Sequence, residues 1–210
     1  MIQFNGKLLF FLVMFQVTLA FAIPNPIDIL EMPSQNRAEV FQQVSSKLNW
    51  QDFLKIVNDD QQPMKIRWRA MMALTQLDKK NAENELPRFI QSKTWYIRNA
   101  AMIAMNEISK EKAALMAEKL LHDPALVVRS AAVDLLKNNL NQQRRDLLWD
   151  EFHQARNVHG KSNLWIRSQI LEVLAEKPLV HEKKLFETLI SQKDAQIAEV
   201  AKNALEHRFK

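Results

Sequence analysis

The chain has no cysteine, so histidines, carboxylates and serines are the first side chains to test for chemistry. No two histidines have the i, i+4 spacing that places a metal-binding pair on one helix face; the five are His122, His153, His159, His181 and His207. The carboxylate pairs Asp59-Asp60 and Asp150-Glu151 are adjacent in sequence, and adjacent side chains do not face each other on a helix. No serine stands in a G-x-S-x-G motif. The sequence therefore predicts no enzyme, with no catalytic residue, metal site or cofactor.

Composition narrows the class of protein further. Hydrophobic residues make up 47% of the 210 positions and charged residues 25%, which is enough for a substantial core. There are only two glycines, so folds that depend on glycine-rich phosphate loops are disfavoured. The net charge of +5 is modest for this length, and nucleic-acid binders usually carry a denser basic stripe. We therefore expect no nucleic-acid partner.

The first 22 residues have the order of a secretory signal peptide. Lys7 precedes an apolar run that begins at Leu8, and Ala20-Phe21-Ala22 provides an A-x-A cleavage site. The alternative is a membrane anchor, but the 15 residues from Leu8 to Ala22 are short for a span that needs about 20. We expect cleavage before Ile23 and export to the periplasm of a bacterium, or secretion, without stable membrane insertion afterwards.

The rest of the chain contains an internal repeat. Five segments align without gaps; they are 64–74, 95–105, 126–136, 164–174 and 195–205. One column holds only β-branched residues and the next is mostly arginine; these columns are Ile66, Ile97, Val128, Ile166 and Ile197, then Arg67, Arg98, Arg129, Arg167 and Ala198. A column of small residues follows at Ala70, Ala101, Ala132 and Ala201, with Ile170 as its exception. Successive segments are 31, 31, 38 and 31 residues apart, which indicates a repeat architecture with one insertion.

Each segment has the apolar period of a helix, and another amphipathic stretch precedes each one. The repeating unit is therefore predicted to be a helical hairpin, present five times. Residues 23–35, with three prolines, are expected to form an extended leader. A capping helix is predicted to begin at Asn36, where Asn36 and Glu39 have the spacing of a capping box, and the repeat domain would span 36–210.

The segment Asp123-Pro-Ala-Leu-Val-Val-Arg-Ser-Ala-Ala-Val-Asp-Leu-Leu136 resembles the second half of a HEAT repeat of the short bacterial kind. The resemblance covers most of residues 51–209, although Gln61 and Ser92 replace the turn aspartate and repeat five lacks the arginine. It implies an all-α, right-handed α-solenoid. It also implies that the repeat arginines brace the turn between the two helices of each hairpin, and that the second helices line the concave, partner-binding side.

Outward positions of the second helices are polar in the later repeats, for example Ser130, but apolar near the N-terminus. Trp68, Met72 and Ile103, flanked by Lys65 and Arg69, form the candidate binding surface. The alternative is that the N-terminal helix or the leader covers these side chains. The insertion at 157–163 is expected to be a surface loop, with its function left open.

Together these features predict an exported, non-enzymatic scaffold or adaptor that binds another protein or peptide, an inhibitor or immunity-type partner being one variant. The alternative is an envelope-associated enzyme or enzyme subunit, similar to a lyase, with its site in the concave groove.

Overall fold

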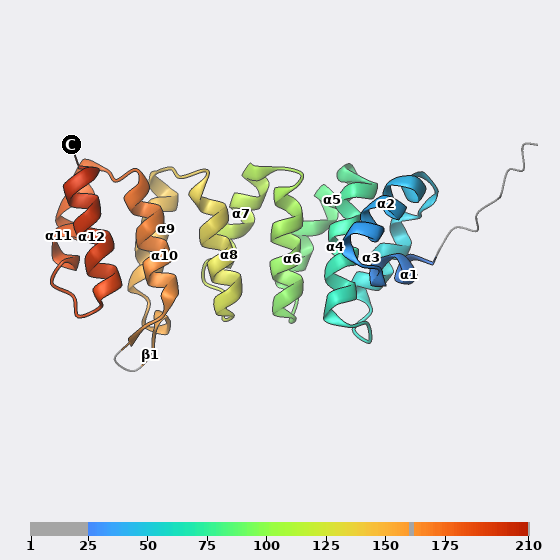
Figure 1. Ribbon diagram of the computed structural model, residues 1–210, viewed down its shortest axis with the longest axis horizontal. Coiled ribbons are helices and arrows are strands. Elements are labelled where there is room, and N and C mark those ends of the chain that lie inside the picture. The colour runs from blue at the N-terminus through green and yellow to red at the C-terminus, as the bar shows by residue number, and fades with distance from the viewer. Residues whose placement is uncertain (1–24, 160–161, 210) are drawn as a thin grey trace, which may run out of the picture.

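The computed structural model describes residues 25–159 and 162–209 (Figure 1). The predicted signal peptide and the insertion residues Gly160 and Lys161 lie outside this part of the chain.

The described residues form an all-α solenoid of five helical hairpins in a single row (Figure 1). The first helix of each hairpin is α3 (Trp50–Asn58), α5 (Lys79–Glu85) continued by the 3₁₀ helix η2 (Leu86–Gln91), α7 (Lys110–Leu120), α9 (Gln142–His153), and η4 (Val180–Glu182) with α11 (Lys183–Leu189). The second helix is α4 (Met64–Leu77), α6 (Trp95–Asn106), α8 (Leu126–Lys137), α10 (Trp165–Glu176) and α12 (Ala195–His207). The predicted all-α solenoid and its five hairpins are therefore confirmed.

The second helices pack against one another along the row, α4 on α6, α6 on α8, α8 on α10 and α10 on α12 (Figure 1). The small residues of the repeat, Ala70, Ala101, Ala132 and Ala201, are all fully buried in the core of the solenoid. A methyl side chain lets two helix backbones approach closely without leaving a void. The buried side chains of successive repeats thus form one continuous hydrophobic core along the solenoid.

Four of the hairpins have a side chain that accepts a hydrogen bond from the backbone in the turn between their two helices. Asp59 accepts from Gln61 N at 3.0 Å, and Ser92 accepts from Thr94 N at 3.2 Å. Asp123 and Asp194 do the same in the third and fifth repeats. The first two repeats, which lack aspartate at the aligned position, therefore build the same kind of turn with Asp59 and Ser92.

The N-terminal part differs from the prediction. Instead of an extended leader, Pro26–Glu31 forms the short helix α1, capped by the side chain of Asn25. Ile29 and Leu30 of this helix are fully buried in the common core, and that burial holds α1 against α4.

The capping helix also begins earlier than predicted. Helix α2 spans Ser34–Val44 and is followed by the 3₁₀ helix η1 (Ser45–Lys47). Pro33 occupies the N-cap position, and its carbonyl accepts the first helical bond from Arg37 N at 2.9 Å. Asn36 therefore lies inside the helix, and the predicted capping box is wrong.

The insertion of the fourth repeat is more ordered than a simple loop. It begins with the 3₁₀ helix η3 (Ala155–Asn157) and continues into a two-stranded antiparallel ribbon of β1 (Val158–His159) and β2 (Ser162–Asn163). The ribbon projects beyond the N-terminal end of α10 (Figure 1). Asn157 itself is fully buried, so the expectation of a purely surface loop is wrong at this residue.

Candidate functional site

The repeat arginines bind the turn of their own hairpin. Arg98 Nη1 donates to the carbonyl oxygens of Ser92 and Lys93 at 2.7 and 3.2 Å. Arg129 Nη1 donates to the carbonyl oxygens of Asp123 and Pro124 at 2.8 and 3.1 Å. Arg67 Nε and Arg167 Nε each donate at 2.9 Å to a carbonyl near the end of the preceding first helix, those of Val57 and Phe152. These bonds satisfy carbonyl groups that a helix end leaves without partners.

The same guanidinium groups also reach the next repeat. Arg98 makes a bidentate pair with Asp123 at 2.5 and 2.7 Å, and Arg67 donates to the Tyr96 hydroxyl at 3.0 Å. Ala198 of the last repeat takes the arginine position where no further hairpin follows among the described residues. Arg67, Arg98 and Arg129 therefore each link the turn of their own hairpin to the next repeat, which is a structural role.

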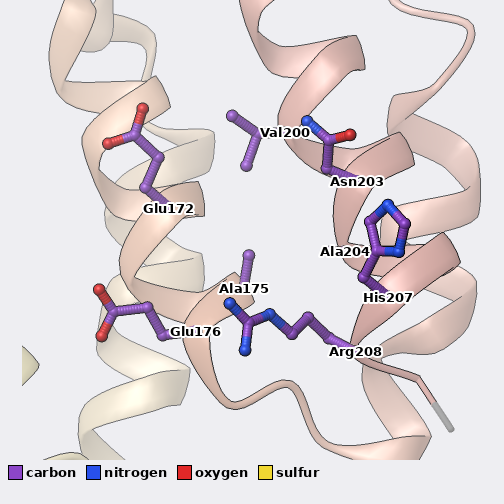
Figure 2. Close-up of a pocket in the computed structure, with 8 residues that line it drawn as sticks. All are labelled: Glu172, Ala175, Glu176, Val200, Asn203, Ala204, His207 and Arg208. Carbon is purple, nitrogen blue, oxygen red and sulfur yellow. The ribbon is translucent and has the colours of Figure 1, made fainter.

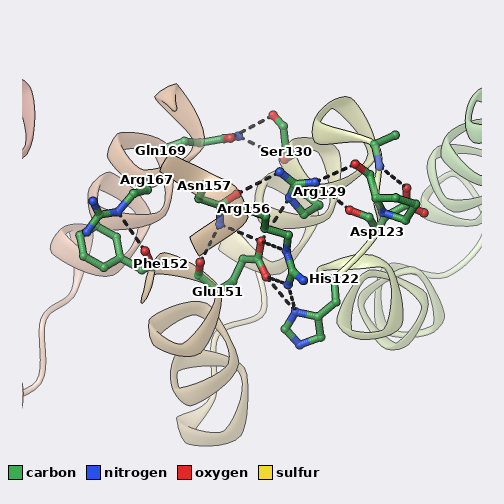
Figure 3. Close-up of polar contacts among 12 residues, drawn as sticks. His122, Asp123, Arg129, Ser130, Glu151, Phe152, Arg156, Asn157, Arg167 and Gln169 are labelled. Atoms are coloured by element: carbon green, nitrogen blue, oxygen red, sulfur yellow. Dashed lines mark hydrogen bonds and ion pairs between the residues drawn. The ribbon is translucent and has the colours of Figure 1, made fainter. Parts of the chain in front are cut away.

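Arg129 also belongs to a buried polar cluster around Glu151, which Figure 3 shows. Glu151 is fully buried, and its Oε1 accepts from Asn157 Nδ2 at 2.8 Å and lies 3.2 Å from Arg129 Nε. Its Oε2 lies 2.8 Å from His122 Nδ1 and pairs with Arg156. Asn157 also accepts from Arg129 Nη2 at 3.0 Å, so a residue of the insertion completes the cluster.

Two opposing effects set the pKa of Glu151. Burial raises it, whereas hydrogen bonds from Arg156, Asn157 and His122 lower it, and the net result is a pKa below the usual range. Glu151 is therefore ionised at neutral pH, with both oxygens occupied and none of its surface exposed. A substrate could not reach this carboxylate, so its contact with His122 does not form an accessible acid–base pair.

Helix α9 contributes two further buried cations that the sequence analysis did not single out. Arg144 donates to Glu118 at 2.7 Å and to Glu111 at 2.6 Å, both on α7. Arg145 pairs with the fully buried Glu182 of η4, which also accepts from Trp149 Nε1 at 2.9 Å. Burial raises the pKa of Glu182, but the bonds from Arg145, Leu179 N and Trp149 hold it below its usual range. Adjacent arginines thus connect α9 to both neighbouring repeats.

Three of the predicted binding residues lie together. Trp68, Arg69 and Met72 are half-buried and line a cavity of about 390 Å³ between α4 and the N-terminal helices. The opposite wall comes from α1 and α2 and includes Leu30, Arg37 and Phe41. The apolar surface was expected to be either exposed for binding or covered by the N-terminal segment. The structure shows partial cover, since α1 and α2 lie over part of this surface and the cavity remains between them and α4.

The other two predicted residues lie elsewhere. Lys65 is exposed in the first turn of α4, and Ile103 is half-buried on α6; neither lines this cavity. The outward columns are also more buried than predicted. Ser130 is buried and donates to Gln169 Oε1 at 2.9 Å, because neighbouring second helices meet at this column.

A row of exposed apolar side chains was missed by the sequence analysis. It comprises Met64, Trp95, Val127 and Trp165, each 42–51% exposed, at the first or second position of a second helix. All four are therefore next to the turn within their hairpin. The starts of these second helices lie at one edge of the solenoid, from which the β1–β2 ribbon projects (Figure 1). These residues fall in the first two columns of the aligned segments, before the β-branched column, and that position is the signal in the sequence that could have identified them. We call these four residues the turn-edge row.

A second cavity, of about 580 Å³, opens between α10 and α12 (Figure 2). Glu172 and Glu176 line the α10 side, and His207 and Arg208 lie across from them on the α12 side (Figure 2). Glu176 is paired with Lys137 of α8. Among the described residues, no ion pair crosses this cavity.

Within residues 25–159 and 162–209, no group of histidines and carboxylates is arranged to hold a metal ion. In the same ranges, no helix combines the length and the apolar character that a membrane crossing requires.

The row of stacked helical hairpins, braced at its turns by arginine, defines the molecule as an α-solenoid. The family model for HEAT repeats matches residues 51–137, which cover the first three hairpins. Residues 51–137 are therefore HEAT repeats, which supports for this part of the chain the resemblance seen in the sequence. A comparison with curated proteins gave no match.

Proposed function

We propose that this chain is an exported, non-enzymatic scaffold that binds another protein. HEAT repeats generally serve as interaction scaffolds. The observation that carries the proposal for this chain is the turn-edge row, in which successive repeats each expose a large apolar side chain at the same edge.

The row has the features of a contact surface. Large exposed apolar side chains that line up on one surface are typical of interaction sites, and tryptophan is enriched among the residues that dominate binding energy. The two tryptophans, Trp95 and Trp165, are both held at the start of a helix whose interior is packed into the core. Because the backbone of the solenoid is already ordered, the scaffold loses little conformational entropy when a partner docks along this edge.

The export part of the proposal rests on residues 1–22 alone. Their basic residue, apolar run and A-x-A site favour delivery to the periplasm or secretion. The partner would then be an envelope or extracellular protein.

The enzyme alternative would need an accessible pair of groups for acid–base chemistry. The closest histidine–carboxylate contact among the described residues, that of His122 with Glu151, involves a fully buried carboxylate. The cavity between α10 and α12 offers Glu172 and His207, but these lie on opposite walls (Figure 2). This arrangement favours the scaffold over the enzyme.

Site-specific photo-cross-linking in cells tests the proposal. A benzophenone amino acid is placed at Trp95 or Trp165 in the turn-edge row, and as a control at Leu115 or Leu185, which are equally apolar and exposed on first helices. We expect one and the same protein to be cross-linked from both row positions and not from the controls. Adducts from all four positions, or from none, would contradict a binding edge.

A further inference from the structure

The cavity between α4 and the N-terminal helices combines an apolar floor with two positive charges. Trp68, Met72 and Phe41 provide apolar surface, and Arg37 and Arg69 belong to the same lining. Neither guanidinium forms an ion pair with a carboxylate of the described part of the chain, although other arginines such as Arg98 and Arg144 do. This cavity is therefore electropositive and apolar at once.

The two guanidinium groups are held next to each other by the end of α1. Arg69 Nη1 donates to the carbonyl oxygens of Leu30 and Met32 at 2.5 and 3.3 Å, and Arg37 Nη1 donates to the same Met32 oxygen at 3.0 Å. In each guanidinium the hydrogen bonds come from Nη1, which leaves the Nε and Nη2 donors for a ligand. Two neighbouring forks of this kind match the geometry of a carboxylate.

The electrostatics of the pair agree with this geometry. Burial and the positive charge of Arg69 lower the pKa of Arg37, so the site disfavours its own positive charge when it is empty. A bound anion would offset the repulsion between the two positive charges.

We propose that this cavity binds the C-terminal residue of a partner protein, with its α-carboxylate on Arg37 and Arg69 and its apolar side chain against Trp68 and Met72. The inference rests on the proposed protein-binding function and specifies which part of the partner is recognised. The volume of about 390 Å³ is at the small end of ligand sites and fits a single large residue.

A C-terminal residue fits this cavity better than an internal acidic residue. In a C-terminal residue, the carboxylate and the apolar side chain leave the same Cα atom, so both enter one small cavity. In an extended segment with an internal Asp or Glu, the side chains of the adjacent residues point to the opposite face. The apolar group beside the internal carboxylate would therefore point away from Trp68.

The experiment measures fluorescence polarisation of labelled hexapeptides with the full chain isolated from the envelope of expressing cells. The probes are Gly-Ser-Gly-Ser-Gly-Leu and the same peptide ending in Phe, each with a free carboxylate or a C-terminal amide. We expect the free acid to bind at least about tenfold more tightly than the amide, because only the acid forms charge-assisted bonds. Equal binding of acid and amide, or no binding at about 1 mM peptide, would overturn the proposal.

Variants assign the effect to the cavity. Arg37→Gln and Arg69→Gln should each weaken binding of the acid by about tenfold and leave the amide unchanged. Arg88→Gln is the matched control, since Arg88 is exposed and distant in sequence from the cavity. Because Arg69 also anchors α1, Arg69→Lys is measured in parallel; it keeps the charge and should bind more tightly than Arg69→Gln. If Arg88→Gln has the same effect as the cavity variants, general charge attraction explains the binding and the proposal fails.

Two competitors test whether the carboxylate must be that of a peptide C-terminus or can come from an internal acidic residue or a simple fatty acid. An amidated peptide with an internal Asp-Leu pair should compete poorly, and so should hexanoate, which has the carboxylate without a peptide backbone. Competition by either one equal to that of the free peptide would overturn the assignment to a C-terminus. The cross-linking at the turn-edge row is independent of these results, so the scaffold proposal could stand if the peptide experiment fails.

Discussion

A guanidinium group carries five donors in a rigid fork, and Arg67, Arg98 and Arg129 use this fork to bind two consecutive repeats. Arg98 is the clearest case, since it binds two carbonyl oxygens of its own turn and both oxygens of Asp123 in the next. Lysine, as a single point donor, could not replace it in this geometry.

Removal of Arg98 should be costly for stability. Arg98→Ala leaves the buried Asp123 carboxylate without its cation, and loss of one partner of a buried pair typically costs about 3–5 kcal/mol. The free energy of unfolding, measured by urea denaturation, is expected to fall by this amount. Arg88→Ala, which breaks an exposed pair with Glu85, should stay within about 0.5 kcal/mol of the parent chain. Equal effects of the two variants would show that Arg98 is not a brace.

The Glu151 cluster makes stability depend on acid. The folded-state pKa of Glu151 lies below its value in the unfolded chain, so the stabilisation is complete above a pH of about 4.3, the usual pKa of glutamate. It is lost as the pH falls from there through the folded-state pKa. Each such carboxylate contributes a slope of at most about 1.4 kcal/mol per pH unit in that window. Glu151→Gln should reduce the slope of unfolding free energy against pH between about pH 3 and 4.3. An unchanged slope in the variant would mean that other carboxylates carry the acid sensitivity.

At the scale of helices, the sequence predicted which face of each second helix is buried better than it predicted which face is exposed. The small-residue column was placed correctly, because side chains three or four positions apart share a helix face wherever the helix lies. The outward columns were placed less well, because α6, α8 and α10 each contact two neighbouring second helices. Ser130 is buried for this reason and is not a neutral position for substitution.

Ala132→Leu should test the close-approach column. Ala132 is fully buried, and three additional carbon atoms would overpack the core at a cost of about 1–3 kcal/mol. The same substitution at Ala195, exposed at the first position of α12, should change the melting temperature little. Similar melting temperatures for the two variants would contradict the packing described above.

Trp68 and Trp165 should respond differently to truncation. Trp68 is half-buried against the core and beside α1 and α2, so Trp68→Ala should lower the free energy of unfolding by about 2 kcal/mol. Trp165 is 51% exposed, and Trp165→Ala should remain within about 0.5 kcal/mol. Denaturant titration of both variants makes the comparison. A neutral Trp68→Ala would mean that its packing adds nothing to stability.

For the whole molecule, the repeats give a rigid row with an apolar edge at the turns and a cationic groove at the N-terminal end. The two surfaces differ in character, since the edge is an open row of side chains and the groove encloses a single small volume. A partner could engage both, and the resulting affinity would exceed that of either contact alone.

Export is the prediction that concerns the whole chain. Mass spectrometry of the protein recovered from periplasm or culture medium should give a chain that starts at Ile23. Cleavage there would leave two residues, Ile23 and Pro24, before Asn25, the first residue that the structure describes. Recovery of the intact chain, with Met1, from the soluble cytoplasm would contradict export.

The sequence by itself determined the repeat and its helical hairpins, whereas the bracing role of its arginines was implied by the resemblance to HEAT repeats. These features depend on local periodicity and on contacts that recur at a fixed spacing, so each repeat provides independent evidence for the same geometry. The boundaries of the N-terminal helices were less predictable. The three prolines suggested an extended leader, yet burial of Ile29 and Leu30 stabilises the short helix α1.

Only the tertiary structure decided which apolar residues are exposed and which charges meet. Trp68 and Trp95 are both tryptophans near the start of a second helix, but only Trp68 lines a groove with the N-terminal helices. Glu151 and Asn157 were not distinguishable from surface residues of a helix end and a loop until the turns of two repeats came together. Burial and electrostatic partnership depend on segments far apart in the chain, and a period read along the sequence carries no information about them.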